Sequence, residues 1–170
     1  GGSGGQCAPT PNDNVYFTSN SFSNANQVIT LDIDNNGIVN LDWTGVTNSP
    51  QFNMTSKSLE ISGSVTYTAD MSISSPGTLK FITNSNSFFT SAGHNTGNLD
   101  IDKSGGVFSQ LDNFNSSNRS LYVRSGSTYN SNDYDLSFHQ VIFHGSPSGS
   151  VTTTINTGVS KITIDGYRLE

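Results

Sequence analysis

The sequence predicts an all-β protein, a right-handed parallel β-helix (β-solenoid) with about 20–22 residues in each coil and an irregular N-terminal cap. One observation behind this prediction is that the chain has only four Ala and two Glu, so strong helix formers are scarce. Another is that Ser, Thr, Asn and Gly together make up nearly half of the chain, which indicates many turns. A repeat of short apolar runs then identifies the type of β fold.

Six short runs, in which apolar residues alternate with other residues, recur at a nearly constant interval. They begin at Leu59, Leu79, Leu99, Leu121, Val141 and Ile162. The strands of a β-sandwich are usually separated by roughly 8–12 residues, whereas a constant interval of about 20 is typical of one coil of a parallel solenoid. A further run at Leu41 would add an upstream coil, giving six or seven coils.

Stacking these runs on one another puts an apolar residue at every inward position. In a parallel stack, equivalent residues lie about 4.8 Å apart and alternate residues face the interior. The first inward ladder is Leu59, Leu79, Leu99, Leu121, Val141 and Ile162. The second is Ile61, Phe81, Ile101, Val123, Phe143 and Ile164. The register therefore satisfies burial in each coil.

The outward positions of the same register are compatible in charge. One outward row is Glu60, Lys80, Asp100, Tyr122, Ile142 and Thr163, and the next is Ser62, Ile82, Asp102, Arg124, His144 and Asp165. Lys80 would have a carboxylate on each side, and Arg124 would have Asp102 beside it. Opposite charges on neighbouring strands contribute about 0.2–1 kcal/mol per pair, and like charges, which would be unfavourable, do not meet in these rows.

A single domain is expected over residues 15–170, after a flexible lead-in or linker at residues 1–14. Residues 15–51 fit the repeat poorly and would form a cap or the first irregular coils, since an open solenoid end exposes its core and its backbone edge. Residues 52–168 would form the regular coils. Further apolar residues in each coil indicate a three-sided cross-section, with Gly and Asn at corners that need left-handed backbone geometry.

Four segments of the N-terminal half follow one another in a recognisable order: PTPNDNVYFTSNSF (9–22), QVITLDI (27–33), LDWTG (41–45) and SLEISGSVTY (58–67). This order resembles a module of very long secreted surface proteins of Bacteroidetes-type bacteria, which are adhesin-like or gliding-associated. The resemblance covers roughly residues 8–165. It implies a parallel β-helix on the cell surface that acts in adhesion or as a spacer beside neighbouring modules of the same long chain, and it implies no catalytic residues.

The charge and the hydropathy of the chain argue against two kinds of partner. A net charge of −6, a pI near 4.7 and seven scattered Lys and Arg argue against nucleic acid, because phosphate binding needs a basic stripe. No apolar run approaches the roughly 18 residues of a membrane span, so membrane insertion is not expected. Low charge and abundant Asn, Ser and Thr favour an extracellular or cell-surface location. The single Cys7 cannot close a disulfide within the chain.

Asp32, Asp34 and Asn36, followed by Gly37, match the beginning of a calcium-binding loop. Oxygen ligands at alternate positions before a glycine suit a tight turn around Ca²⁺. The twelfth position is Trp43, so the bidentate carboxylate of such a loop is missing. The alternative is a strand with two outward aspartates that ends in a turn. Apart from this calcium candidate, no cofactor is expected.

Asp100, Asp102, Arg124 and His144 would gather on one outer face of the solenoid. Polysaccharide lyases and hydrolases with a β-helix fold have carboxylates and Arg on such a face, where an acid pair protonates a glycosidic oxygen. The alternative is a structural charge ladder, which already explains the pattern, and fold analogy alone is a weak reason to infer an activity.

Three tyrosines are the candidate ligand-binding residues. Tyr122 occupies an outward ladder position, and Tyr129 and Tyr134 lie in the nearby polar segment SGSTYNSNDYD (125–135). Sugars stack on exposed aromatic rings while their hydroxyls meet polar side chains. The alternative is a loop folded over the solenoid, with the rings covering apolar surface.

These observations favour a non-catalytic extracellular adhesion or structural stalk module of a large bacterial cell-surface protein, with surface glycans or polysaccharide as a candidate partner. One alternative is a dedicated carbohydrate-binding module, for which a jelly roll is a candidate fold because KITIDGYRL (161–169) looks like its final strand. The other alternative is a polysaccharide lyase or hydrolase on a β-helix.

Overall fold

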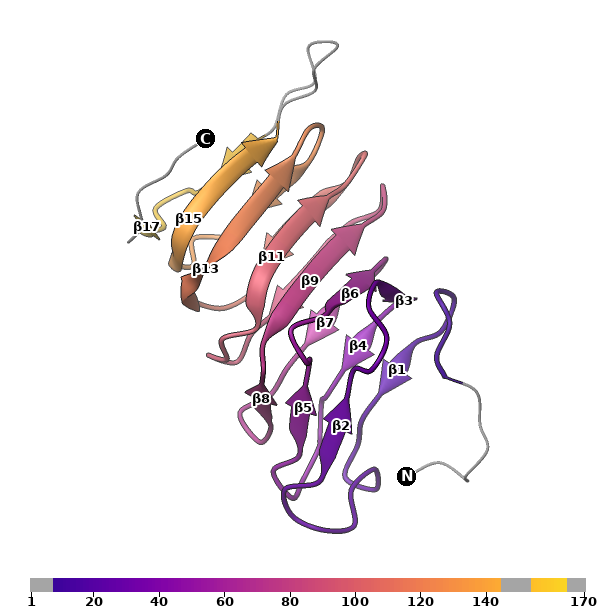
Figure 1. The fold of residues 1–170 in the computed structure, drawn as a ribbon. Helices are drawn as coiled ribbons and strands as arrows, with labels where there is room; N and C mark the ends of the chain where they lie inside the picture. The colour runs from indigo at the N-terminus through magenta and orange to yellow at the C-terminus, as the bar shows by residue number, and fades with distance from the viewer. Residues whose placement is uncertain (1–7, 145–153, 165–170) are drawn as a thin grey trace.

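Parallel strands wind around one axis in the computed structural model of the chain, which describes residues 8–144 and 154–164. Within these ranges there are strands and no helix, and every strand pair is parallel. The strands form a β-solenoid of stacked coils, which confirms the predicted fold class (Figure 1). The jelly-roll alternative is wrong, because jelly rolls are built from antiparallel strands.

Two sheets of seven strands each run the length of the stack. The strands of the first are β3 (Asn36–Ile38), β6 (Ser58–Ile61), β9 (Gly77–Ile82), β11 (Gly97–Asp102), β13 (Phe114–Arg124), β15 (Leu136–His144) and β17 (Ile162–Ile164). The strands of the second are β1 (Val15–Tyr16), β4 (Leu41–Asp42), β7 (Val65–Thr66), β10 (Ser87–Thr90), β12 (Val107–Gln110), β14 (Thr128–Asn130) and β16 (Thr154–Asn156). We call them the β9 sheet and the β7 sheet.

A third sheet covers only the first turns. It has three strands, β2 (Val28–Thr30), β5 (Gln51–Asn53) and β8 (Ser72–Ser74). With this sheet, the early turns have the predicted three-sided cross-section. In Figure 1 the sheet lies at the N-terminal end of the stack, in the indigo and purple part of the ribbon.

The predicted register is confirmed over five of the six runs. The first inward ladder pairs Leu59 with Leu79, Leu79 with Leu99, Leu99 with Leu121 and Leu121 with Val141. The second inward ladder continues through the paired strands in the same way. Phe81, Ile101 and Val123 on that ladder are fully buried, so alternation has put the apolar side chains inside as expected.

The predicted register is wrong at the last run. Ile162 pairs with Leu136 and not with Val141, and Ile164 pairs with Phe138 and not with Phe143. The reason is the length of the last turn, because the chain from Leu136 to its partner Ile162 is longer than any of the central repeats. The spacing between Val141 and Ile162 matched the repeat only by coincidence. Asp165, which we assigned to an outward row, lies outside the described residues.

The prediction for Leu41 is also wrong, because this run belongs to another sheet. Leu41 pairs with Val65, whereas Leu59 pairs with Asn36 and Ile61 pairs with Ile38. Strands β1, β2 and β3 therefore form the first turn of the same solenoid and pair in parallel with β4, β5 and β6. Of the two alternatives for residues 15–51, a cap or first coils, the pairing supports first coils.

The core begins with an aromatic cluster in the first turns. Trp43 is fully buried, and its ring centroid lies 4.1 Å from that of Phe17 and 5.7 Å from that of Phe52. Further along, Phe81 lies 4.7 Å from Phe108 in an edge-to-face arrangement. Aromatic pairs of this kind contribute about 0.5–1.5 kcal/mol beyond their buried area.

Asn and Asp side chains at the corners hydrogen-bond the backbone of the next coil. Oδ1 of Asp34 accepts the N–H of Ser58, and Oδ1 of Asn40 accepts the N–H of Ser64, each at 2.7 Å. The carboxylate of Asp135 accepts the N–H of Lys161 at the same distance. These bonds satisfy backbone donors where the strand ladders are interrupted, so the coils remain bonded to one another at their corners.

Two glycines mark the closest approach between coils. Gly97 pairs with Gly77 and has a φ of +98°, a conformation that residues with side chains rarely adopt. A Cβ atom on Gly97 would lie 2.0 Å from the carbonyl oxygen of Gly77, and one on Gly77 would lie 1.9 Å from that of Lys57. Only glycine fits these two positions without a shift of the backbone.

Candidate functional site

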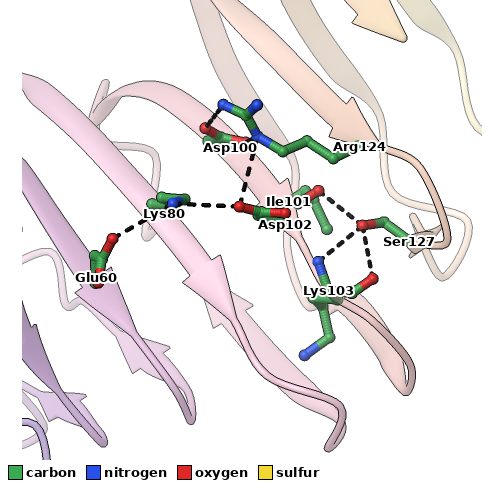
Figure 2. A network of polar contacts seen from close by, with 8 residues as sticks. All are labelled: Glu60, Lys80, Asp100, Ile101, Asp102, Lys103, Arg124 and Ser127. Atoms are coloured by element: carbon green, nitrogen blue, oxygen red, sulfur yellow. Dashed lines mark hydrogen bonds and ion pairs between the residues drawn. The ribbon is translucent and has the colours of Figure 1, made fainter. Parts of the chain in front are cut away.

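Five charged side chains of the β9 sheet form one connected network on its outer face (Figure 2). Nζ of Lys80 lies 3.4 Å from the carboxylate of Glu60 and 3.2 Å from that of Asp102. Arg124 donates two hydrogen bonds to Asp100, from Nε at 2.7 Å and from Nη2 at 2.6 Å. Nε of Arg124 also lies 3.8 Å from Asp102, which joins the two halves. We call these five side chains the charge ladder.

The pair of Lys80 with Glu60 is as predicted, whereas the other main partners in the charge ladder differ from the predicted ones. The strand register does put Lys80 opposite Asp100, and Arg124 one strand beyond Asp102, as expected. However, Lys80 contacts Asp102 diagonally, and Arg124 takes Asp100 as its main partner. Long side chains on a sheet can reach diagonal neighbours as well as those directly opposite. The bidentate geometry available at Asp100 then favours the guanidinium over the ammonium.

Electrostatics stabilises the charged forms of both cations. The hydrogen bonds that Arg124 donates to Asp100 raise the pKa of Arg124, against an opposing effect of burial. Burial alone would lower the pKa of Lys80, but hydrogen bonds and charge attraction from Asp102 and Glu60 outweigh it and leave the pKa raised. The side chain of Asp100 is only 8% exposed, so its charge depends on Arg124 for compensation.

Replacing Arg124 with methionine is expected to lower the free energy of unfolding by about 1–3 kcal/mol, because Asp100 would keep a nearly buried charge without its cation. The cost stays below that of a fully buried pair, since the Arg124 side chain is 37% exposed. Urea unfolding followed by circular dichroism at neutral pH would measure it. Arg119→Met on the same strand, where no ion pair is found among the described residues, is the matched control. Equal losses in both variants would contradict the role of Arg124.

The fold separates the three candidate tyrosines. Tyr122 lies on the outer face of β13, where its ring is half-buried and stacks on His144 with centroids 5.9 Å apart. Tyr134 lies in the turn after β14 and is 39% exposed. Tyr129 is fully buried, and its hydroxyl donates a hydrogen bond to Gln110. Tyr129 is therefore a core residue that no ligand reaches in the folded chain, and the three rings form no common site.

The calcium candidate occupies the turn before β3. Asp32 is exposed, and Asn36 is the first residue of β3. One oxygen of Asp34 accepts the backbone N–H groups of Asn35 and Ser58 at 3.1 and 2.7 Å, so it serves the turn and the next coil. In the described part of the chain, no three His, Cys, Asp or Glu residues come together as a metal-binding group. Calcium binding here stays a prediction.

A buried lysine is the feature that the sequence did not reveal. Lys103 follows β11 and is 1% exposed, and its Nζ donates to the carbonyl of Ser85 at 2.6 Å and to the hydroxyl of Ser87 at 3.0 Å. Its backbone is held by Ser127, whose hydroxyl accepts the Lys103 N–H at 2.9 Å (Figure 2). Among residues 8–144 and 154–164, no carboxylate forms an ion pair with Lys103. The solenoid therefore contains a cation that is hydrogen-bonded but has no counter-charge in this part of the chain.

Stability is expected to depend on pH through Lys103. Burial lowers the pKa of this lysine below its ordinary value of 10.5, so the folded chain loses the proton at a lower pH than the unfolded chain. Stability contributed by this residue must therefore rise with pH between the lowered pKa and 10.5. As the pH rises from the lowered pKa to 10.5, the unfolding free energy of the wild-type chain should increase relative to that of Lys103→Met. Parallel pH curves for the two proteins would contradict this.

Comparisons of the chain with protein-family models, with curated proteins and with solved structures found no match. A search of the described residues for a helix long and apolar enough to cross a membrane also found none.

Proposed function

We propose that the chain is a non-catalytic extracellular module, an adhesion or structural stalk element of a large bacterial cell-surface protein. The observation that carries this proposal is that the coils are bonded to one another by side chains as well as by backbone ladders. The resemblance of residues 8–165 to modules of Bacteroidetes-type secreted surface proteins supports the location. Neighbouring modules of the same long chain are the expected partners at its ends.

Stiffness follows from the bonding between coils. Each sheet has a continuous backbone ladder, and the corners add side-chain bonds such as those from Asp34, Asn40 and Asp135. On the outer face, Asn98 accepts the N–H of Ser120 at 2.9 Å, and the charge ladder spans four strands. Bending the stack would break several such bonds at once, which suits a part that bears load.

The partners of the outer carboxylates support a non-catalytic role. A glycosidase needs one carboxyl group that holds a proton and one that attacks or activates water. Here Asp100 accepts both hydrogen bonds of a guanidinium, and Asp102 lies between Lys80 and Arg124. Cations thus lie beside both carboxylates, in the places that a substrate would have to occupy. This arrangement suits a structural ladder better than an acid pair.

The proposal can be tested by pulling the chain from both ends in a force microscope, between marker domains of known unfolding force. Coils are expected to detach one after another, at forces comparable to those of the markers. Each coil of about 20 residues, such as that from Leu59 to Leu79, should release about 70 Å of chain. Extension at negligible force, like that of an unstructured linker, would contradict a structural role.

The non-catalytic part has its own test, because the charge ladder contains the only acid pair that we considered for catalysis. No turnover of polysaccharides is expected from the wild-type chain. Turnover that disappears in Asp102→Ala but persists in Asp70→Ala, which removes an exposed carboxylate in a turn, would overturn the proposal in favour of an enzyme.

A further inference from the structure

A groove on the outer face of the β7 sheet has features of a ligand site that the candidate residues did not include. It lies beside the first strand of this sheet and has a volume of about 210 Å³. The residues that line it are Tyr16, Asn40, Leu41, Asp42, Ser64 and Thr66. They come from three adjacent strands and their immediate neighbours, so the groove lies across consecutive coils.

The strand register explains why polar side chains and one aromatic ring face outward here. Leu41 and Val65 are paired and buried, so the residues on either side of each point to solvent. Tyr16 pairs with Asp42, and Asp42 pairs with Thr66, which gives one outward row of a ring, a carboxylate and a hydroxyl. The ring of Tyr16 is 60% exposed, the largest exposure of any aromatic residue in the described chain.

Hydrogen bonds hold the floor of the groove and leave specific groups for a ligand. The amide of Asn40 is fixed between Asn14 and Ser64, by its Nδ2 donating at 2.6 Å and its Oδ1 accepting at 2.7 Å. Asp42 uses Oδ1 to accept the N–H of Thr44 at 2.7 Å, and its Oδ2 has no partner among the described residues. The hydroxyls of Tyr16 and Thr66 likewise have no protein partner in that part of the chain.

We propose that this groove binds one pyranose unit of a neutral polysaccharide. The apolar face of the sugar would stack on Tyr16, and its hydroxyls would donate to Oδ2 of Asp42 and exchange hydrogen bonds with Thr66. Sugar sites combine these two groups, because an aromatic ring covers the C–H face of the sugar and a carboxylate accepts hydrogen bonds from its hydroxyls. The net charge of −6 and Asp42 itself disfavour an anionic sugar.

The size of the groove fixes the scale of the interaction. A volume of about 210 Å³ is below the roughly 300–1,000 Å³ of sites that enclose a drug-sized ligand, so the groove holds one unit of a longer chain. Affinity of about millimolar strength is expected from such a site. Weak single sites become strong when repeated along one chain, which accords with adhesion. The inference thus rests on the proposed adhesive role and specifies its ligand class and site.

The test is a titration of ¹⁵N-labelled chain with cellohexaose, mannohexaose and, as an anionic probe, hexagalacturonate. The amide signals of Tyr16, Asp42 and Thr66 are expected to shift with at least one neutral probe. Binding should be about tenfold weaker in Tyr16→Ala and retained in Tyr16→Phe, because the ring face makes the contact. Asp42→Asn should weaken it as well. Tyr134→Ala, which removes another exposed ring, is the matched control and should bind normally.

Several outcomes would overturn the inference. These are no shift with either neutral hexasaccharide, equal binding by Tyr16→Ala and wild type, binding of the anionic probe alone, or shifts confined to the surface around Tyr122. None of these results touches the force measurement, which needs no ligand. Failure of the sugar site and failure of the structural role are therefore distinguishable.

Discussion

Replacing Phe81 with alanine is expected to lower the free energy of unfolding by about 3–5 kcal/mol. Phe81 is fully buried in β9, and its ring packs against Phe108 at 4.7 Å and Phe89 at 6.2 Å between centroids. Alanine would leave a cavity between coils that the hydrogen-bonded ladders on both sides prevent from collapsing. The loss would therefore include the cost of the cavity as well as that of the lost apolar burial.

Phe88→Ala is the matched control for this prediction. Phe88 lies in the neighbouring coil but is 45% exposed, so the same change of side chain should cost less than about 1 kcal/mol. Far-UV circular dichroism in urea follows the whole chain, whereas the fluorescence of Trp43, the single tryptophan, follows the first turns. A cost below about 1 kcal/mol for Phe81→Ala would show that the ring is not in the core.

Gly97→Ala is expected to lower the free energy of unfolding by about 2–4 kcal/mol. Alanine is strained at a φ of +98°, and its Cβ would lie 2.0 Å from the carbonyl oxygen of Gly77. Relieving this clash would require β9 and β11 to separate where they are hydrogen-bonded in register. Chemical denaturation of the variant and the wild type under identical conditions would measure the difference.

Gly93→Ala separates the two causes. Gly93 also has a positive φ, of +79°, but a Cβ there would meet nothing within 4 Å. It should therefore show the backbone strain without the clash, at a cost of about 1 kcal/mol. If the two variants lose the same stability, the close approach of the coils at Gly97 contributes nothing.

The register of the central coils could be predicted because burial and charge were both satisfied by one spacing. Between Leu59 and Val141 the coils are almost equal in length, so the repeat is visible in the sequence. The last coil, from Leu136 to Ile162, is longer and breaks the repeat. A rule based on spacing has no means to detect the residues added there.

The first coil could not be recognised from the sequence, for a different reason. Its strand in the β9 sheet, β3, has the sequence Asn-Gly-Ile, in which only Ile38 is apolar. Turn-forming residues are thus part of a strand, because they pair with the neighbouring strand β6. By its spacing, the more apolar run at Leu41 is predicted to lie in the ladder of the β9 sheet, although this run belongs to the β7 sheet. Tertiary pairing has here overridden local preference.

The burial of two residues could not be predicted, because it depends on partners far away in the sequence. Tyr129 lies in a polar segment and looks exposed, but inside the core its hydroxyl donates a hydrogen bond to Gln110 of the preceding coil. The ammonium group of Lys103 donates hydrogen bonds to Ser85 and Ser87 of an earlier coil. Neither pairing leaves a signal near the residue in sequence. By contrast, Tyr16 could have been noticed from its position between two apolar residues at the beginning of a strand.

The lengths of the coils determine what this architecture can build. About twenty residues of α-helix span about 30 Å, whereas the same number in one coil advances the stack by a single strand spacing of about 4.8 Å. The seven stacked strands of each long sheet thus give a body only roughly 30 Å long. The chain gains breadth and lateral area for each residue, and very little reach. A long filament made this way would demand an exceptionally long polypeptide, while a short one offers a broad wall on which many weak contacts can be arrayed.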